Sequence, residues 1–473
     1  MLEYLDNQTK LTSNQYRIIG AAILGDMLEF FDLYLIGFVL AIIIKPWHLT
    51  FGVSAVILLS SGVGAMVGAG FWGYIADRIG RKAVFIATVL NFSIATGILA
   101  FTPNNGWFFL TFFRFLTGFG VGGLYSVDLP LVQEFVPSNK RGLISGMITS
   151  AVPVGSFLAA TMGAFLAPHI GWRGLFAVGV LPAALTLVVR AWVPESPRWL
   201  ARMGRAEEAR KSLAWALEVD PKTIPLSAVT FPVQEKPRFR DLFQYPRSLC
   251  VSWFGNLGVQ VGSYGMNLWA PTLLVLVLRT TPAHASFLFM FCPIAGFLGR
   301  IMFSFLSDGI GRRMSGALVG VGAAVSLACA GIFHAQFISG ISVFWLMLVV
   351  AHVFEDGGYA IVGPYSAEVW PAHLRATGMG SSYGFGGLGK IIGPLGVALI
   401  VGSSNIIKPE VSISGLMPAF LYLAAFCLMA GIVYGCFGIE TKGRSFESID
   451  DQLTGQKVAR KAAAMHAGSG NSM

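Results

Sequence analysis

The chain has 473 residues, of which 55% are hydrophobic and only 12% are charged, about half the charged fraction of a soluble domain. This composition excludes an ordinary soluble protein and indicates one embedded in a membrane. The formal net charge of +9 would suit a nucleic-acid partner, but the distribution of the basic residues argues against one. The five cysteines all fall inside apolar segments, so no disulfide framework is expected.

Apolar segments long enough to cross a bilayer occur along the whole chain. A run of roughly 20 apolar residues spans the hydrocarbon core as a helix. Twelve such runs are predicted, at residues 18–44, 53–75, 83–102, 107–135, 142–167, 174–193, 248–278, 285–306, 314–336, 341–369, 376–402 and 414–438. They group into an N-terminal bundle at 18–193 and a C-terminal bundle at 248–438, joined by a loop at 194–247, with tails at 1–17 and 439–473. We therefore expect an all-α membrane protein with twelve transmembrane helices.

Lysine and arginine are concentrated on one side of the predicted spans. With the N-terminus inside, the inner loops and tails hold 25 of the 33 basic residues, and the outer loops hold four. Cytoplasmic loops carry such an excess. Both termini are therefore expected in the cytoplasm, with the chain in the inner cell membrane, the lipid bilayer as its partner and no nucleic acid. We expect it to function as a monomer.

The first span carries three acidic residues, Asp26, Glu29 and Asp32, at a depth where charge is costly. At ~100° and ~1.5 Å per residue they fall within about 120° of one helix face, over ~9 Å. Three carboxylates this close cannot all be ionised in a low dielectric, so at least one is expected to hold a proton. Residues 29–37 also resemble the first-helix motif of metabolite:proton symporters, with Phe-Phe for Trp-Tyr. The three are candidate proton-coupling residues; alternatively, one acid pairs with a fixed basic partner and only holds helices together.

A charged turn between the second and third spans returns once in the chain. Residues 73–82 read GYIADRIGRK and residues 307–313 read SDGIGRR, with their aspartates 231 residues apart. A second motif, E-x-x-P-x-x-x-R, occurs at Glu134 and again at Glu368, an offset of 234 residues. Two motifs at nearly one offset indicate two halves of a duplicated unit. The turn resembles the loop between the second and third helices of the major facilitator superfamily, which implies two pseudo-symmetric six-helix bundles.

By this resemblance, the charged residues at the inner ends of the spans are cytoplasmic gating residues. They form interhelical ion pairs that close the inner side in one state and separate in the other. Each pair is worth little more than ~1 kcal/mol, so several can bias a two-state equilibrium without freezing it. The candidates are Asp77, Arg81, Glu134, Arg141, Glu195, Asp308, Arg312, Glu368, Arg375 and Glu440. The alternative, that they only set the topology, suits the basic residues but not the acids.

The fourth span carries Arg114, which opens the pattern R-x-x-x-G-x-G-x-G-G, and Asp128 further along. The two lie ~21 Å apart along the helix and cannot pair with each other. The pattern resembles one in these transporter families, where an acid often follows the glycines, but here Leu124 stands in that place. Arg114 is a candidate substrate-binding residue that would attract a carboxylate. The glycines can equally serve close helix packing.

The inner loop opens with Pro-Glu-Ser-Pro-Arg, in which Ser196 can cap a helix and Pro197 suits its first position. A helix with an apolar stripe is expected to run to about Leu217 and to lie flat on the inner face. The motif resembles the sugar-porter branch of the superfamily. Residues 440–445 resemble the second signature of that branch, with Ile439 in place of its usual proline.

The seventh span presents a stripe of uncharged polar side chains, Asn256, Gln260, Ser263 and Asn267, with Tyr264 beside them. Intervals of four, three and four residues place the first four on one helix face. Such a stripe suits hydrogen bonding to a small polar ligand, so all five are candidate substrate-binding residues. The alternative is hydrogen bonding between helices, worth about 0.6 kcal/mol each.

The tenth and eleventh spans carry the mid-membrane charges of the second half. Glu355 and Asp356 point ~100° apart, so different partners are expected, and both are candidate proton-coupling residues. Lys390 is either a fixed counter-ion for one of these acids or a substrate-binding residue for an anion. Arg190 and Arg300 lie near inner ends of spans and are expected to snorkel to the surface.

These features favour a transporter that works by alternating access and binds its substrate near mid-membrane between the bundles. We expect symport of a proton with a small organic acid or related metabolite, with Glu29 and Asp32 carrying the proton. Two alternatives stay open: a sugar or polyol symporter, favoured by the sugar-porter signatures, and a proton-driven exporter of cations, favoured by the buried acids. A membrane sensor would need a soluble domain that is absent from the sequence. No nucleophile–base or metal-ligand spacing appears, so no enzymatic activity, cofactor or metal is expected.

Overall fold

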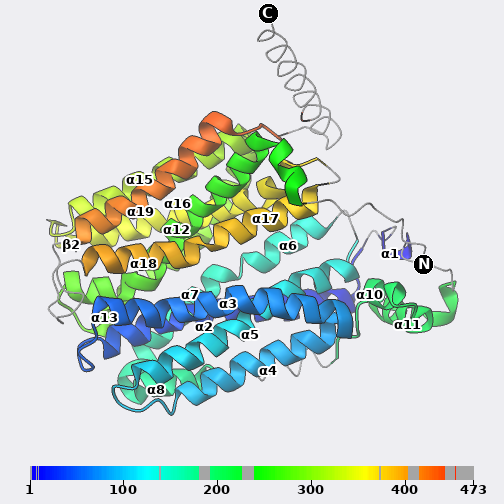
Figure 1. Cartoon of the computed structure of the whole chain (residues 1–473), viewed down its shortest axis with the longest axis horizontal. Helices are drawn as coiled ribbons and strands as arrows, with labels where there is room; N and C mark the ends of the chain where they lie inside the picture. Colours follow the sequence, from blue (N-terminus) through cyan, green and yellow to red (C-terminus); the bar gives the residue numbers. More distant parts are fainter. Residues whose placement is uncertain are drawn as a thin grey trace, which may run out of the picture. The chain divides into compact units, whose positions relative to one another are not determined.

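The computed structural model describes residues 3–6, 8, 10–137, 140–180, 192–225, 239–371, 374–402, 415–442 and 453. Within these ranges the chain is mostly helical, with one antiparallel hairpin of β1 Phe337–Ile338 and β2 Ile341–Ser342. The helices form two compact units (Figure 1). Unit 1 comprises Met1–Val233, Asn267–Ile294 and Gly402–Ile413, and unit 2 comprises Gln234–Met266, Ala295–Val401 and Ser414–Met473.

Each unit is built from long helices and short helical segments. Unit 1 contains α1 Glu3–Asp6, α2 Ser13–Ile43, α3 Phe51–Ile79, α4 Arg81–Leu99, α5 Trp107–Phe135, α6 Arg141–Thr149, α7 Val152–Thr161, the π-helix η2 Met162–Leu166, α8 Ala167–Val178, α10 Pro197–Arg202, α11 Ala206–Leu217, η3 Pro221–Thr223 and α13 Pro282–Phe289. Unit 2 contains η4 Phe239–Gln244, α15 Arg312–Ile332, α16 Val343–Glu368, α17 Arg375–Gly387, α18 Gly389–Val401, α19 Leu416–Ile432 and the π-helix η6 Val433–Phe437. Two helices contribute to both units, α12 Pro246–Val277 and α14 Phe291–Ile310.

The first long helix, α2, begins where its sequence provides a cap. Thr12 Oγ1 accepts a hydrogen bond from the Gln15 N–H at 3.2 Å, and Gln15 Oε1 accepts one from the Thr12 N–H at 2.9 Å. This capping box satisfies two N–H groups that a helix end otherwise leaves without partners. Ser196 caps α10 in the predicted way, because its Oγ accepts from the Trp199 N–H at 3.1 Å and Pro197 starts the helix.

The two copies of the charged turn share one backbone form. Gly80 separates α3 from α4 with a φ of +106°, and Gly311 precedes α15 with a φ of +93°. Residues with a Cβ rarely adopt such angles, so both turns need glycine. The repeat seen in the sequence therefore recurs in the backbone.

Among the described residues, nine helical segments are long and apolar enough to cross a bilayer. Two more long helices, α2 and α12, are not in that group; α2 carries three acids and α12 carries the polar stripe. Most of the sixth predicted span, 174–193, lies outside the described residues. The helices are consistent with the expected twelve-helix membrane fold, and both of the helices that hydropathy alone leaves out carry predicted site residues.

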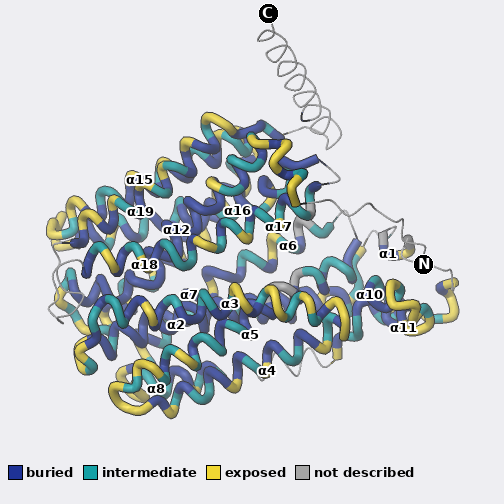
Figure 2. Tube along the Cα trace, in the orientation of Figure 1, coloured by how far each residue is buried: buried dark blue, intermediate teal, exposed yellow. Residues whose placement is uncertain are grey.

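Exposed apolar side chains lie on the outward sides of the helices. Buried and exposed residues alternate along single helices such as α4 and α15 (Figure 2). Ile94 of α4, Phe305 of α14 and Val325 of α15 are 60%, 76% and 58% exposed. Large exposed apolar surfaces of this kind suit contact with lipid.

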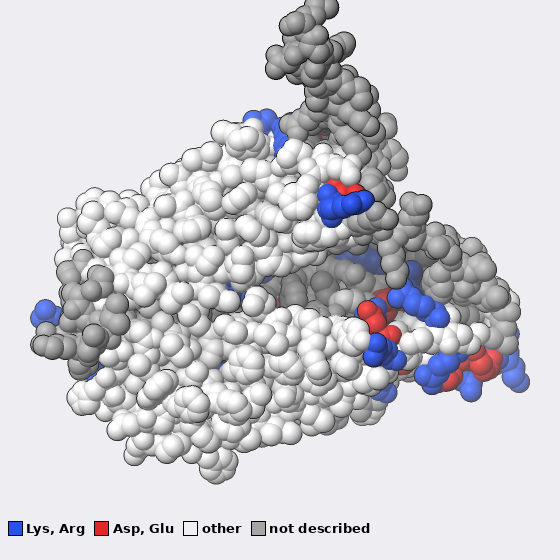
Figure 3. All heavy atoms as spheres, in the orientation of Figure 1, with Lys and Arg blue, Asp and Glu red and all other residues white. Residues whose placement is uncertain are grey.

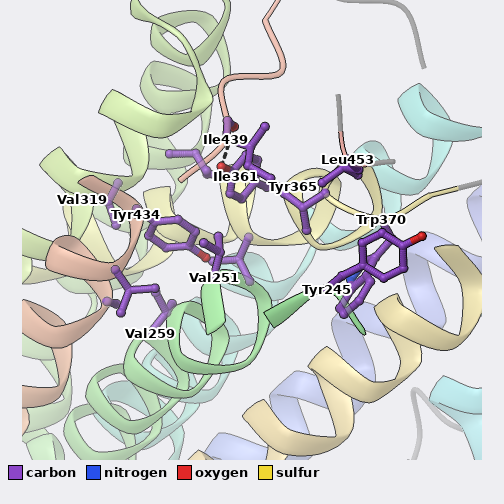
Figure 4. Close-up of a cluster of buried hydrophobic side chains, with 14 of the residues drawn as sticks. Tyr245, Val251, Val259, Val319, Ile361, Tyr365, Trp370, Tyr434, Ile439 and Leu453 are labelled. Atoms are coloured by element: carbon purple, nitrogen blue, oxygen red, sulfur yellow. Dashed lines mark hydrogen bonds between the residues drawn. The ribbon is translucent and has the colours of Figure 1, made fainter. Parts of the chain in front are cut away.

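A buried apolar cluster in unit 2 fixes the ends of two helices (Figure 4). The rings of Tyr365 and Tyr434 stand 5.6 Å apart between centroids. The Tyr365 hydroxyl donates to the carbonyl oxygen of Ile439 at 2.5 Å. This contact holds the chain after η6 beside the end of α16, which places Glu440 near Glu368.

Candidate functional site

In unit 1, Asp32 of α2 forms a buried ion pair with Arg114 of α5. Arg114 Nη1 lies 2.9 Å from Asp32 Oδ2 and donates to the Asp32 carbonyl oxygen at 3.2 Å. Ser61 of α3 accepts from Arg114 Nη2 at 3.0 Å, and Thr96 of α4 donates to Asp32 Oδ1 at 3.1 Å. Arg114 is fully buried and Asp32 is 2% exposed. Side chains of four helices, α2 to α5, therefore meet at one pair of opposite charges.

This ion pair joins two predicted site residues that stand 82 residues apart in the chain. The sequence predicts that Asp32 carries a proton and that Arg114 attracts a substrate carboxylate. In the structure the side chains of these two residues are in contact. Breaking a buried pair leaves an uncompensated charge, at a cost of about 3–5 kcal/mol. Protonation of Asp32 would therefore change the energy of the neighbouring guanidinium strongly. Contact between Arg114 and a substrate stays a prediction.

The other two acids of the first span are buried, and so is an acid of α5 that approaches the same helix. Asp26 and Glu29 are each 6% exposed, as is Asp128. A Cβ built on Gly25 would stand 3.8 Å from Asp128 Oδ2, so this carboxyl approaches α2 next to Asp26 in the chain. The sequence prediction gave Asp128 no role, because Leu124 occupies the position where an acid was expected. The sequence feature that could have identified Asp128 as a site residue is its charge inside a predicted transmembrane span.

The glycines that follow Arg114 serve helix packing. A Cβ on Gly118 would overlap the backbone of Ser61, and one on Gly122 would overlap the backbone of Ala65. The glycines thus let α5 approach α3 closely enough for Arg114 to reach the Ser61 hydroxyl. The alternative interpretation of this pattern, close packing, is the one that the structure supports.

Gly122→Ala is expected to push α3 and α5 apart and to lower the thermal unfolding temperature of the purified protein, because overpacking costs about 1–3 kcal/mol. Gly70→Ala is the matched control, since a Cβ there meets nothing within 4 Å. Both substitutions raise helix propensity by the same amount. The difference between the two unfolding temperatures therefore measures the effect on packing. Equal unfolding temperatures for the two variants would contradict the packing role of Gly122.

In unit 2, a lysine lies among aromatic and amide side chains of other helices. Gly389 of α18 packs directly on α12, where a Cβ would stand 2.6 Å from the Gln260 Cβ. Lys390, the next residue, places its Nζ 5.0 Å from the centroid of the Tyr264 ring. Tyr359 of α16 donates its hydroxyl hydrogen to Gln260 Oε1 at 3.2 Å. A cation, two aromatic rings and an amide therefore lie together.

The acids of α16 have different surroundings, as their adjacent positions predict. Arg300 Nη2 of α14 lies 3.4 Å from Asp356 Oδ1, and its guanidinium carbon lies 5.1 Å from the Tyr359 ring centroid. The prediction that Arg300 snorkels to the surface is wrong: it is 7% exposed, because it pairs with a buried carboxylate on a neighbouring helix. Arg190 lies outside the described residues.

Lys390 is not the ion-pair partner of either acid of α16. Among the described residues, Asp356 pairs with Arg300 and Glu355 forms no ion pair. The counter-ion alternative for Lys390 therefore has no support in unit 2. The substrate-binding alternative stays a prediction.

The polar stripe of the seventh span is buried along α12. Asn256 and Ser263 are 0% and 1% exposed, and Asn267 is 7% exposed in the part of α12 that belongs to unit 1. Asn256 faces Gly386 of α17, and neither its oxygen nor its nitrogen has a hydrogen-bond partner within the described ranges. Gln260 bonds to Tyr359 of another helix, as the alternative of hydrogen bonding between helices predicts, and hydrogen bonding of the stripe to a ligand stays a prediction.

At the charged turn of unit 1, Glu195 caps helix α4. Its Oε1 accepts from the N–H groups of Arg81 at 3.0 Å and of the next residue at 3.2 Å. The Arg81 side chain lies 3.1 Å from Glu134 Oε1 and 3.7 Å from Asp77 Oδ1. Ser196 donates its hydroxyl hydrogen to Glu134. Figure 3 shows that, on the face drawn, charged side chains of this unit gather at the end with α10 and α11.

The charged turn of unit 2 repeats this arrangement residue by residue. Glu440 Oε1 accepts from the Arg312 N–H at 3.0 Å, and Arg312 Nε lies 2.9 Å from Glu368 Oε2. Thr441 donates to Glu368 at 2.5 Å, as Ser196 does to Glu134, and Asp308 lies 3.3 Å from Arg312. The two sugar-porter signatures thus supply the same pair of groups, an acid and a hydroxyl, to the two turns.

The two remaining candidate gating residues begin helices. Arg141 is the first residue of α6, and its Nε donates to the Gln133 carbonyl oxygen at 2.9 Å. Arg375 is the first residue of α17. That all these charges close the inner side of the protein in one state stays a prediction.

Glu195→Ala and Glu440→Ala are each expected to lower the free energy of unfolding by about 1–2 kcal/mol, because each removes a helix cap. The two losses should be similar, since the geometry is repeated. Glu208→Ala is the control: its ion pair with Arg205 is about half exposed, and such pairs contribute little. Thermal unfolding in detergent would measure all three. If Glu440→Ala were as stable as Glu208→Ala, the expectation that the two charged turns are equivalent would be refuted.

Comparisons with known proteins agree on the kind of protein. The family described as "Sugar (and other) transporter" matches residues 18–453. The chain is 31% identical over 439 residues to the niacin transporter NiaP of Acinetobacter baylyi, covering 92% of this chain and 96% of that one. It is 29% identical over 443 residues to the putative niacin/nicotinamide transporter NiaP of Bacillus subtilis, covering 92% and 98%. These relatives are transporters and not enzymes.

A solved structure of similar fold covers the same length. The D-xylose–proton symporter superposes with a TM-score of 0.72 at 20% identity, covering 92% of this chain and all of that one. At this identity the likeness shows the fold alone.

Proposed function

Because the chain belongs to the sugar (and other) transporter family of the major facilitator superfamily, we propose that it imports a small aromatic acid together with a proton by alternating access. It is a multi-pass membrane transporter, and the resemblance predicted from its charged turn is confirmed. The observation that carries the proposal is the buried ion pair of Asp32 and Arg114.

The ion pair supplies a coupling mechanism. When Asp32 takes a proton, Arg114 loses its counter-charge in a site that excludes water. The uncompensated positive charge then attracts the substrate carboxylate, so proton and anion binding favour each other. Coupling requires that the energy difference between the two states of the transporter depends on whether the proton and the substrate are bound. Asp26 and Glu29, on the same helix, would assist by holding or passing the proton.

The site in unit 2 supports the substrate class. Lys390 offers a positive charge beside the ring of Tyr264, and the ring of Tyr359 is held through Gln260. A planar ring with a carboxylate matches this combination, since the ring packs on aromatic side chains and the carboxylate meets the lysine. The relatives named for niacin transport carry a substrate of this kind. The inner cell membrane, with both termini in the cytoplasm, is the proposed location.

Uptake into proteoliposomes under an imposed pH gradient tests the proposal. Nicotinate and benzoate should accumulate when the outside is acidic. A proton ionophore, which collapses the pH gradient, should abolish this accumulation. Xylose and an organic cation serve as the competing substrate classes. Accumulation of xylose in preference to both acids would replace the proposed substrate, and acid uptake that ignores the pH gradient would refute proton coupling.

A further inference from the structure

Helix α16 holds a second buried acid that the proposed mechanism leaves unused. Asp356 is paired with Arg300, but its neighbour Glu355 points elsewhere. Glu355 is 2% exposed, and neither of its carboxyl oxygens has a hydrogen-bond partner among the described residues. It is thus a buried acid without the ionic partner that Asp32 has in unit 1.

The carboxyl of Glu355 occupies a niche that a glycine makes possible. A Cβ on Gly262 of α12 would stand 2.9 Å from Glu355 Oε1 and would overlap Cys427 of α19. The titratable groups that interact with Glu355 there are Cys427 of α19 and Asp356, the next residue of α16, and His352 of α16 interacts with Asp356. Helix α12 contributes Gly262 there, and the charged residues of α15, Arg312 and Arg313, are at its start.

Within the described part of the chain, an ionised carboxylate in this niche has no donor and no cation to compensate it, which costs several kcal/mol. Asp356 adds a negative charge nearby, although its own charge is neutralised by Arg300. The protonated form is therefore the one that the niche holds at low cost. A group of this kind releases its proton when water or a cation reaches it.

Helix α12 connects this niche to unit 1. Its part up to Met266 belongs to unit 2 and carries Gly262, whereas its part from Asn267 onward belongs to unit 1. There it packs on α2, where a Cβ on Gly37 would stand 2.9 Å from the Leu268 carbonyl oxygen. Leu268, which contacts α2, thus lies about two turns from Gly262 along the same helix.

We infer that Glu355 is a second proton-binding site, which loads and releases one proton in each transport cycle. This inference rests on the proposed proton-coupled uptake. One proton at Asp32 compensates the charge of a monocarboxylate, and the proton at Glu355 adds one net positive charge. Transport of nicotinate is therefore expected to be electrogenic, with two protons for each substrate anion.

Nicotinate uptake into proteoliposomes, with a potassium diffusion potential added to a fixed pH gradient, tests the inference. The steady-state accumulation by the unaltered protein should rise about tenfold for each ~59 mV of inside-negative potential. Glu355→Gln should keep pH-driven uptake and lose its dependence on the potential. Glu355→Asp should keep both, since it can still carry a proton.

Each outcome decides one of the two proposals. Uptake by the unaltered protein that follows the pH gradient but ignores the potential would overturn the role of Glu355, even if the Gln variant fails to fold. An unchanged potential dependence in Glu355→Gln would overturn it as well. Absence of any pH-driven uptake by the unaltered protein would instead refute the proposed function, and this inference with it.

Discussion

Asp32→Asn is expected to remove one coupled proton and so to lower pH-driven accumulation of nicotinate about tenfold for each pH unit of gradient, while leaving exchange of nicotinate across the membrane intact. Asparagine keeps the shape of the side chain, and its single oxygen can still accept a hydrogen bond from Arg114. Its NH2 group replaces the oxygen that accepts from Thr96 and cannot accept, and the side chain cannot carry a proton. The variant therefore resembles the protonated state at every pH. A gradient of one pH unit gives about a tenfold accumulation per coupled proton, so the variant should keep only the accumulation that the proton of Glu355 drives. Proteoliposome uptake with and without the gradient measures this.

Thr96→Ala is the matched control for that variant. It removes a neutral hydrogen bond of 3.1 Å from the same carboxyl and leaves its charge and its pair with Arg114 unchanged. Such a bond is worth about 1 kcal/mol, so accumulation should persist. If Asp32→Asn and Glu29→Gln both accumulate nicotinate as the unaltered protein does, the proton is carried elsewhere and the mechanism is wrong.

Lys390→Met is expected to weaken nicotinate binding by ten- to a hundredfold, because a hydrogen bond to a charged group contributes about 1.5–3 kcal/mol. Methionine keeps much of the length of the side chain and its apolar contacts but removes the positive charge. Lys390→Arg should retain most of the affinity, since it keeps a cation near the Tyr264 ring. Equilibrium binding to the purified protein measures the three affinities.

Nicotinamide supplies the matched ligand for this experiment. It has the ring of nicotinate without the carboxylate, so Lys390→Met should bind it as well as the unaltered protein does. A loss of affinity that is equal for both ligands would assign Lys390 to folding or helix packing. Unchanged affinity for nicotinate would remove the anion-binding role altogether.

Much of the architecture was determined by the sequence alone. The two charged turns at a nearly constant offset predicted a duplicated transporter, and Gly80 and Gly311 have the same backbone form because a positive φ excludes other residues. The acids of the first span were identified as site residues because charge is costly at that depth. The caps at Ser196 and Pro197 followed from local hydrogen-bonding chemistry, which depends on neighbours in the chain.

The tertiary structure decided which charges meet. Arg300 was expected at the surface and pairs with Asp356, 56 residues away, and Lys390 has neither acid of α16 as its ion-pair partner. Hydropathy and spacing give the depth and face of a residue on its own helix. The partner depends on how closely helices distant in sequence approach each other, and here glycines such as Gly118 and Gly262 set that distance.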